Sequence, residues 1–226
     1  RTSEELKTKI TILNNIGMCH LYLGEFEQSA GYFTDALLLA ENVGDKILQA
    51  GTLSSLGGVQ MGQKKYEEAA GYFNRSLALH MEMNDQAGVA DALNNIGSVF
   101  DAQNMPDRAY EYFEHSLLIN EKLGRNPRIA LNLTNIGKTY FDRNQYLRAG
   151  EYLEAAIDIF ERLRMNASGT VRRDYFESMI GTYRLLIFTH LRNNNASAAV
   201  AAIEQSKARY LAEKIQGLND QVVLPT

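Results

Sequence analysis

The residues of this chain that are able to do chemistry are few and scattered. They are His20, His80, His115, His190 and the one cysteine, Cys19. Metal sites draw several such ligands from a short characteristic spacing, and a nucleophilic cysteine needs a base beside it. No histidine here has a second His, Cys or carboxylate at a convincing metal spacing, and Cys19 has no obvious activating base. We therefore expect no catalytic residue, no metal and no cofactor, with Cys19 as a small apolar filler.

Two segments have compositions found in binding motifs. GTLSSLGG at 51–58 is rich in glycine, but it lacks the lysine and the spacing of a phosphate-binding loop. RLRMNASGTVRR at 162–173 is basic, and we expect a solvated loop there rather than a binding patch. Neither segment predicts a nucleotide or phosphate site.

The overall charge and hydropathy exclude other classes of partner. Lys and Arg total 23 against 27 Asp and Glu, whereas a nucleic-acid surface needs a basic face. Apolar runs fall well short of the roughly 20 residues that cross a bilayer. The charged start, RTSEELKTKI, has no apolar signal segment and leads us to expect a fragment of a longer protein. With one cysteine, which fits a reducing compartment, we expect a cytoplasmic protein without nucleic-acid or membrane partners.

A pentapeptide returns every 40 residues and predicts the helices that carry the histidines and Cys19. LNNIG stands at 13–17 and at 93–97, LSSLG at 53–57 and LTNIG at 133–137. At 12, 16 and 19 residues after its glycine come a small residue, a large one and a second small one. These are Ser29, Ala69, Ala109 and Ala149, then Phe33, Phe73, Phe113 and Leu153, then Ala36, Ser76, Ser116 and Ala156. Such agreement among four copies indicates a structural repeat.

Spacings of three and four within each copy predict two helices, separated and ended by polar breaks. The breaks between helices are GE at 24–25, GQKK at 62–65, QNMP at 103–106 and RNQ at 143–145, and the units end on VGDK, MNDQ, LGRNP and LRMN. Glycine suits the left-handed position after a helix, Asp and Asn suit N-caps, and proline suits a first turn. We assign these roles to Gly44 and Gly124, to Asp45, Asp85 and Asn126, and to Pro106 and Pro127.

The small residues explain why the pattern repeats. A glycine on the first helix facing an alanine or serine on the second lets the two backbones approach closely, and the large residue one turn later fills the groove. His20 and His190, three residues after the glycine position, should also pack between the two helices of their units. One such hairpin cannot bury its apolar face alone, so we expect the hairpins to stack.

This pattern resembles the tetratricopeptide repeat, with a unit lengthened to 40 residues as in Pins-type adaptors, kinesin light chains and bacterial peptide-receptor regulators. The resemblance implies an all-α fold, a right-handed superhelical solenoid of about five hairpins. The expected array covers 1–217, with units at 5–44, 45–84, 85–124, 125–164 and, degenerate, 174–217; residues 218–226 are a tail or linker.

The degenerate unit follows an insertion in MNASGTVRRDYFES, and Ile187 replaces its glycine, so its two helices should lie further apart. Its last helix resembles the junction between helical repeats and the caspase-like protease domain of CHAT-domain proteins. The matching residues are Glu204, Ser206, Lys207, Ala208, Arg209 and Leu211. The resemblance implies a downstream catalytic domain in the full-length chain; the alternative is an ordinary amphipathic helix.

The first helices should line the inner face of the solenoid, so the residues between their packing positions are the expected contacts for a protein or peptide partner. The expected residues are Asn14, Asn15, Met18 and Tyr22 in the first unit, Ser54, Ser55 and Met61 in the second, Asn94, Asn95, Ser98 and Asp101 in the third, and Thr134, Asn135, Lys138 and Asp142 in the fourth. The tail segment VVLPT is short and apolar enough to fill the same groove.

Asn15, Asn95 and Asn135 hold equivalent positions and predict a ladder of carboxamides, which both donate and accept hydrogen bonds and can hold a peptide backbone. The resemblance to kinesin light chains and peptide-receptor regulators implies the same role. Alternatively, the asparagines only join neighbouring helices.

The sequence thus predicts a non-enzymatic interaction scaffold. The alternatives are a regulatory arm of a CHAT-type peptidase, and a platform that self-associates through the apolar end of its last unit.

Overall fold

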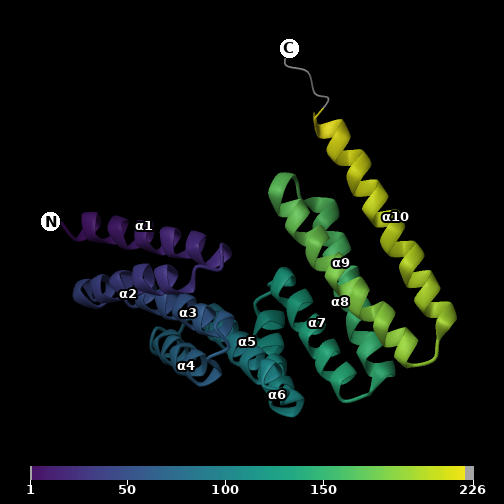
Figure 1. Ribbon diagram of the computed structural model, residues 1–226, viewed down its shortest axis with the longest axis horizontal. Coiled ribbons are helices and arrows are strands. Elements are labelled where there is room, and N and C mark those ends of the chain that lie inside the picture. Colours follow the sequence, from purple (N-terminus) through teal and green to yellow (C-terminus); the bar gives the residue numbers. More distant parts are fainter. Residues whose placement is uncertain (1, 222–226) are drawn as a thin grey trace. The chain divides into compact units, whose positions relative to one another are not determined.

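The structure, a computed structural model, describes residues 2–221, and every regular element in that range is an α-helix (Figure 1). The helices are α1 (Ser3–Tyr22), α2 (Phe26–Val43), α3 (Lys46–Gly62), α4 (Tyr66–Glu82), α5 (Gln86–Ala102), α6 (Pro106–Lys122), α7 (Asn126–Asp142), α8 (Tyr146–Asn166), α9 (Gly169–Arg192) and α10 (Ala196–Gln221). They pair in chain order into five hairpins. The predicted all-α class and helical-hairpin solenoid are confirmed. The chain also divides after Gly124 into two larger compact parts, and from here on we call these the first and second unit. The first unit holds hairpins one to three, and the second holds hairpins four and five.

The recurring glycine lies where the two helices of a hairpin approach most closely. A Cβ added at Gly97 on α5 would lie 2.7 Å from Cε1 of Phe113 on α6, and one added at Gly17 would lie 2.9 Å from the Phe33 ring. At Gly137 the added atom would lie 2.8 Å from Cγ of Leu153. Distances under 3.0 Å are not tolerated by real Cβ atoms, so the predicted close approach of the paired helices is confirmed.

Buried serines join the two helices of the first three hairpins by hydrogen bonds. Ser29 Oγ donates to the Gly17 carbonyl at 2.8 Å, Ser76 Oγ to the Ala50 carbonyl at 2.9 Å and Ser116 Oγ to the Ala90 carbonyl at 2.8 Å. All three serines are fully buried. A small residue at these positions therefore does two things, since it admits the neighbouring backbone and satisfies its own hydroxyl.

Successive hairpins within each unit bury large side chains between them. In the first unit, Phe33 and Leu37 of α2 pack with Leu53, Leu56 and Val59 of α3. In the second unit, α9 packs on α8 through a cluster that includes Leu153, Phe160, Met179 and Tyr183. Polar contacts accompany the packing between hairpins one and two, where Lys7 Nζ lies 2.8 Å from Asp45 Oδ2.

Left-handed residues mark the turns at the predicted breaks. Gly44 and Gly124 adopt positive φ after the second helices of hairpins one and three, as predicted. The turns inside the hairpins repeat the same conformation. Their residues are Gly24, Lys64, Asn104, Asn144 and Asn194. Because glycine and asparagine tolerate this region better than other residues, Lys64 is the exception in the series.

The predicted helix starts are confirmed at four residues and wrong at one. The side chains of Asp45 and Asp85 accept bonds from the backbone N–H of Leu48 and Gly88, each at 3.1 Å. Pro106 begins α6, and Pro127 lies in the first turn of α7. Asn126 is not an N-cap, because α7 already begins with it and Arg125 takes the capping position.

The insertion before the last hairpin is helical, contrary to the expected loop. Helix α8 continues through LRMN to Asn166, and α9 begins at Gly169, so only 167–168 separate them. The inserted residues lengthen both helices. At the other end α10 continues to Gln221, past the expected end at Gly217, and the VVLPT segment lies outside the described residues. Ile187 occupies the glycine position of α9 and packs against the core of the last two hairpins, and the wider spacing of α9 and α10 stays a prediction.

No helix in the described range of 2–221 combines the length and apolar character needed to cross a membrane.

Candidate binding surface

The first variable residue of the pentapeptide faces neighbouring helices. Asn14 Nδ2 donates to Thr52 Oγ1 on α3 at 3.0 Å. Ser54 Oγ lies 2.9 Å from Ser76 Oγ on α4. Thr134 Oγ1 donates to the Ala130 carbonyl and lies 3.2 Å from Thr182 Oγ1 on α9. At this position the expected contact residues therefore hold helices together. Asn94, which holds this position in hairpin three, is half-buried.

The second variable residue of the pentapeptide is more accessible. Asn15 is exposed, and Asn95 and Asn135 are half-buried. Among the described residues, the carboxamides of Asn15 and Asn95 take part in no recorded hydrogen bond, whereas Asn135 has a partner. Ser55, in the same position of hairpin two, donates to the Gly51 carbonyl of its own helix at 3.1 Å. Hairpins one and three thus present carboxamides that the fold itself does not use.

The remaining expected contacts divide between packing and surface. Met18 packs against the core between hairpins one and two, and Met61 against the core around Phe73 and Ile96. Tyr22 is 84% exposed. The other four pair locally or are half-buried. Ser98 Oγ donates to the Asn94 carbonyl, Lys138 Nζ lies 2.8 Å from Asp142 Oδ2, and Asp101 is half-buried.

This combination of a glycine facing a large side chain, paired helices and consecutive stacking is what defines a helical repeat family. A family model described as tetratricopeptide repeat matches residues 8–82 and 88–162. The chain belongs to the tetratricopeptide repeat family. Proteins of this family are built as repeat scaffolds for protein interactions, and the tetratricopeptide resemblance stated from the sequence is confirmed.

Solved tetratricopeptide-like structures share the fold. BtubC (BKLC) from P. vanneervenii superposes with a TM-score of 0.75 at 17% identity, over 99% of this chain and 92% of that one. A Podosopora anserina putative kinesin light chain with nearly identical TPR-like repeats gives 0.69 at 14%, over 94% and 98%. A Rap protein complexed with competence and sporulation factor gives 0.74 at 16%, over 89% of this chain and 53% of that one. No curated protein matches.

Two histidines of this tetratricopeptide chain, His20 and His190, pack against neighbouring helices. His20 stacks on Tyr32 of α2 with ring centroids 5.2 Å apart, as predicted, and lies 2.5 Å from Glu25 Oε2. His190 lies instead against α8 of the preceding hairpin, 3.9 Å from Glu154 Oε1. No three His, Cys, Asp or Glu side chains of the described residues are grouped to hold a metal ion.

The position of His20 holds a stacked aromatic pair in hairpins three and four as well. Phe100 stacks on Tyr112 and Tyr140 on Tyr152, each with centroids 5.3 Å apart. Hairpin two has Gln60 in this position, and the Gln60 Oε1 atom is buried without a hydrogen-bond partner.

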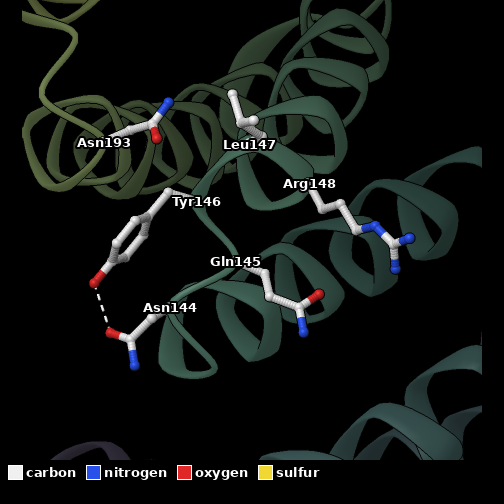
Figure 2. Close-up of a pocket in the computed structure, with 6 residues that line it drawn as sticks. All are labelled: Asn144, Gln145, Tyr146, Leu147, Arg148 and Asn193. Carbon is white, nitrogen blue, oxygen red and sulfur yellow. Dashed lines mark hydrogen bonds between the residues drawn. The ribbon is translucent and has the colours of Figure 1, made fainter.

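Two hollows were not predicted from the sequence, and both lie in the second unit. The first, of about 510 Å³, surrounds the turn between α7 and α8 (Figure 2). In Figure 2 the Tyr146 hydroxyl points to Asn144 Oδ1, 2.6 Å away, and the Leu147 side chain is exposed nearby. The second, of about 400 Å³, is apolar and is lined by Ile180, Ser206, Lys207, Tyr210 and Leu211 of α9 and α10. From the sequence, the residues around the first hollow were predicted only to form a turn. A periodic pattern predicts which residues share a helix face, but it does not predict the space left between the turns of neighbouring hairpins.

The segment that resembles a CHAT junction attaches α10 to the preceding hairpin. Arg209 Nε lies 3.2 Å from Glu161 Oε1 of α8, and Arg164 lies 3.1 Å from the same oxygen. Tyr183 of α9 lies beside this group, and its burial raises the pKa of its hydroxyl. Arg209 therefore has a structural partner within the second unit.

Cys19 corrects a sequence expectation. It was expected to be an apolar filler, but it is exposed on α1. In hairpin two the equivalent residue is Val59, which is fully buried because α2 covers it.

Proposed function

We propose that this chain is an interaction scaffold that holds an extended peptide or partner segment along the first helices of its hairpins. One observation carries the proposal: the Asn15 and Asn95 carboxamides are outside the hydrogen bonds that join the helices, whereas Asn14, beside Asn15, and Ser54, in the equivalent position of hairpin two, are inside them. The expected alternative, in which the asparagines join neighbouring helices, is met by Asn14 and not by Asn15.

The chemistry of these side chains suits a peptide backbone. A carboxamide both donates and accepts, so it can pair with the N–H and the C=O of one residue whatever the side chain of that residue. Neighbouring helices lie about 10 Å apart, so Asn15 on α1 and Asn95 on α5 are separated by roughly two such steps. An extended segment advances about 3.3 Å per residue and would span the two asparagines with about six residues.

The other exposed or adaptable residues of the first unit would supply apolar contacts. Tyr22 is almost fully exposed at the end of α1 and presents an aromatic ring with a polar tip. In the second unit, Asn135, Lys138 and Asp142 hold the equivalent positions on α7 and would offer contacts of the same kind within that unit. The solved Rap structure, a complex with competence and sporulation factor, supports a ligand-binding role for this fold.

A peptide selection tests the proposal directly. A random 12-residue library displayed on phage is selected against the chain, and the enriched peptide is titrated by fluorescence anisotropy. The double variant Asn15→Ala/Asn95→Ala should weaken binding by at least about tenfold, since each lost hydrogen bond to the peptide contributes roughly 1 kcal/mol.

Asn74→Ala is the matched control, because Asn74 is exposed on a second helix and its carboxamide bonds only to the Ala70 carbonyl of its own helix. It should bind as tightly as the unaltered chain. If the double variant binds normally, or if its melting temperature falls by more than that of Asn74→Ala, the asparagines are structural and the proposal is wrong.

A second proposal makes the chain the regulatory arm of a larger CHAT-type peptidase. What favours it is the resemblance of the Glu204–Leu211 segment to that junction, and the contact of Arg209 with Glu161 joins this helix to the preceding hairpin. Reading the gene beyond Thr226 tests it, and a reading frame without a downstream His and Cys pair would exclude it.

A further inference from the structure

The last hairpin exposes positions that earlier hairpins cover. Met18 and Leu21 of α1 pack against the core that hairpin two completes. The equivalent residues of α9 are Phe188 and Leu191, which are 54% and 51% exposed. The free face of hairpin five, which we call the tail face, is therefore a surface built to receive another hairpin.

The apolar hollow between α9 and α10 lies on this tail face and corresponds to a filled site in hairpin one. Its walls Ile180, Ser206 and Tyr210 are the equivalents of Ile10, Ala36 and Ala40. Those three residues form a buried cluster, and Leu48 from the first turn of α3 packs against it. At this position Ala40 is fully buried, and so is Phe160 in hairpin four, whereas Tyr210 is 49% exposed. The hollow is thus the receiving half of the contact between successive hairpins.

The first hairpin carries the complementary half, uncovered. Helix α3 meets the preceding hairpin through Thr52 and Val59, which are fully buried. Their equivalents on α1 are Ile12, which is 51% exposed, and Cys19, which is also exposed. Tyr22 lies one turn further along the helix. We call these residues the head face, and their side chains are uncharged.

We propose that two copies of this chain associate head to tail, with hairpin one of one copy on hairpin five of the other, in the arrangement that joins successive hairpins within each unit. A second copy is the occupant that fits, because each chain displays both halves of one repeated interface. The two faces differ, so the contact is heterologous and leaves a free face at each end of a pair. This surface leaves out the asparagine positions of the proposed peptide site and shares only Tyr22 with it, so Ile12→Glu and Phe188→Glu distinguish the two.

Sedimentation velocity on the whole chain tests the proposal. The unaltered chain should change from the 25.4 kDa monomer to dimers and larger species as concentration rises. Ile12→Glu on the head face and Phe188→Glu on the tail face should each weaken association by more than about tenfold, because each places a charge in an apolar contact. Tyr22→Glu, at a side chain that makes almost no contact within its own chain, should repeat the head-face result.

Mixing the two impaired variants gives the decisive measurement. Ile12→Glu retains a sound tail face and Phe188→Glu a sound head face, so an equimolar mixture should form a dimer and no larger species. Thr8→Leu, which puts on α1 the side chain that Leu48 provides on α3, should tighten association by filling the hollow. Leu38→Glu, on an equally exposed leucine of α2 outside both faces, should associate like the unaltered chain.

Four outcomes overturn the proposal: an unaltered chain that stays monomeric at every concentration, a mixture that stays monomeric, a single variant that dimerises alone, and loss of association in Leu38→Glu. Dimerisation of Ile12→Glu alone would mean that tail faces pair with each other. Circular dichroism of each variant shows whether its helices are intact, and the Tyr22→Glu result carries the head-face test if Ile12→Glu does not fold.

Discussion

Replacing Gly97 by alanine tests the close helix contact on which each of the first four hairpins depends. The added Cβ would lie 2.7, 2.8 and 3.2 Å from Cε1, Cδ1 and Cζ of Phe113. The Phe113 ring is only 2% exposed, so it has no open space to enter and the two helices must separate. The same two helices are joined by the hydrogen bond from Ser116 Oγ to the Ala90 carbonyl. This bond would lengthen as the helices separate.

The expected magnitude follows from a matched comparison with Gly51→Ala. Gly51 also lies inside a first helix, but a Cβ added there meets nothing within 4 Å. Both variants gain the helix propensity of alanine over glycine, about 1 kcal/mol. Only Gly97→Ala overpacks a core, which costs about 1–3 kcal/mol. The difference between the two variants should therefore be about 1–3 kcal/mol, with Gly51→Ala the more stable.

Urea unfolding followed by circular dichroism measures this difference, and thermal melting provides a second measure. For a chain of this size, 1 kcal/mol corresponds to a shift of roughly 2–4 °C in melting temperature. Gly51→Ala should melt at or above the temperature of the unaltered chain, and Gly97→Ala below it. Equal stability of the two variants would mean that the helices move apart at no cost, and the explanation of the 40-residue repeat would be wrong.

Three further predictions concern single residues. Lys64→Asn should stabilise the chain by about 0.5–1 kcal/mol in thermal melting, because asparagine tolerates the left-handed conformation better than lysine; Lys9→Asn, at an exposed position inside α1, should not. Gln60→Phe should raise the melting temperature by relieving an unpaired buried oxygen, worth about 1–2 kcal/mol, and restoring the aromatic pair of the other hairpins; a lower melting temperature would show that the ring does not fit. Asp45→Asn keeps the N-cap but removes the charge. The Lys7 ammonium and the Leu48 N–H hold the pKa of Asp45 below its ordinary value of 3.8, so the carboxylate stabilises the fold above that pH and this contribution disappears as the pH falls through the lowered pKa. The variant should be less stable than the unaltered chain at pH 7 and should approach it in acid, as measured by urea unfolding across pH; a constant difference would contradict this.

The sequence was sufficient to predict the hairpins because their cause is local. The glycine, the small residues and the large residue are spaced by whole turns of a helix, so their shared face follows from the chain alone. Turn residues such as Gly44 and caps such as Asp45 act within four residues of their own position. Asn126 was misjudged because proline at the next position suits either the first or the second residue of a helix.

The binding surface was less predictable, because a period shows which residues share a face and not which neighbour that face meets. Asn14 and Asn15 are adjacent in the first repeat, yet Asn14 bonds to Thr52 on the next first helix and Asn15 is exposed. That choice depends on the rotation of α1 relative to α3, which no spacing encodes. Cys19 was misjudged for a related reason, because its position is buried only where a preceding hairpin covers it.

The pairing of each helix with its immediate neighbours in the chain has a consequence for how the protein folds. Loop closure in either unit brings together segments only about one hairpin apart, so its entropic cost stays small and folding should be fast. Hairpin one can form, and hairpin two can dock on it, while later residues are still being synthesised. Nascent chains ending after α4 should already resist proteolysis over hairpin one, which chains ending after α1 cannot do.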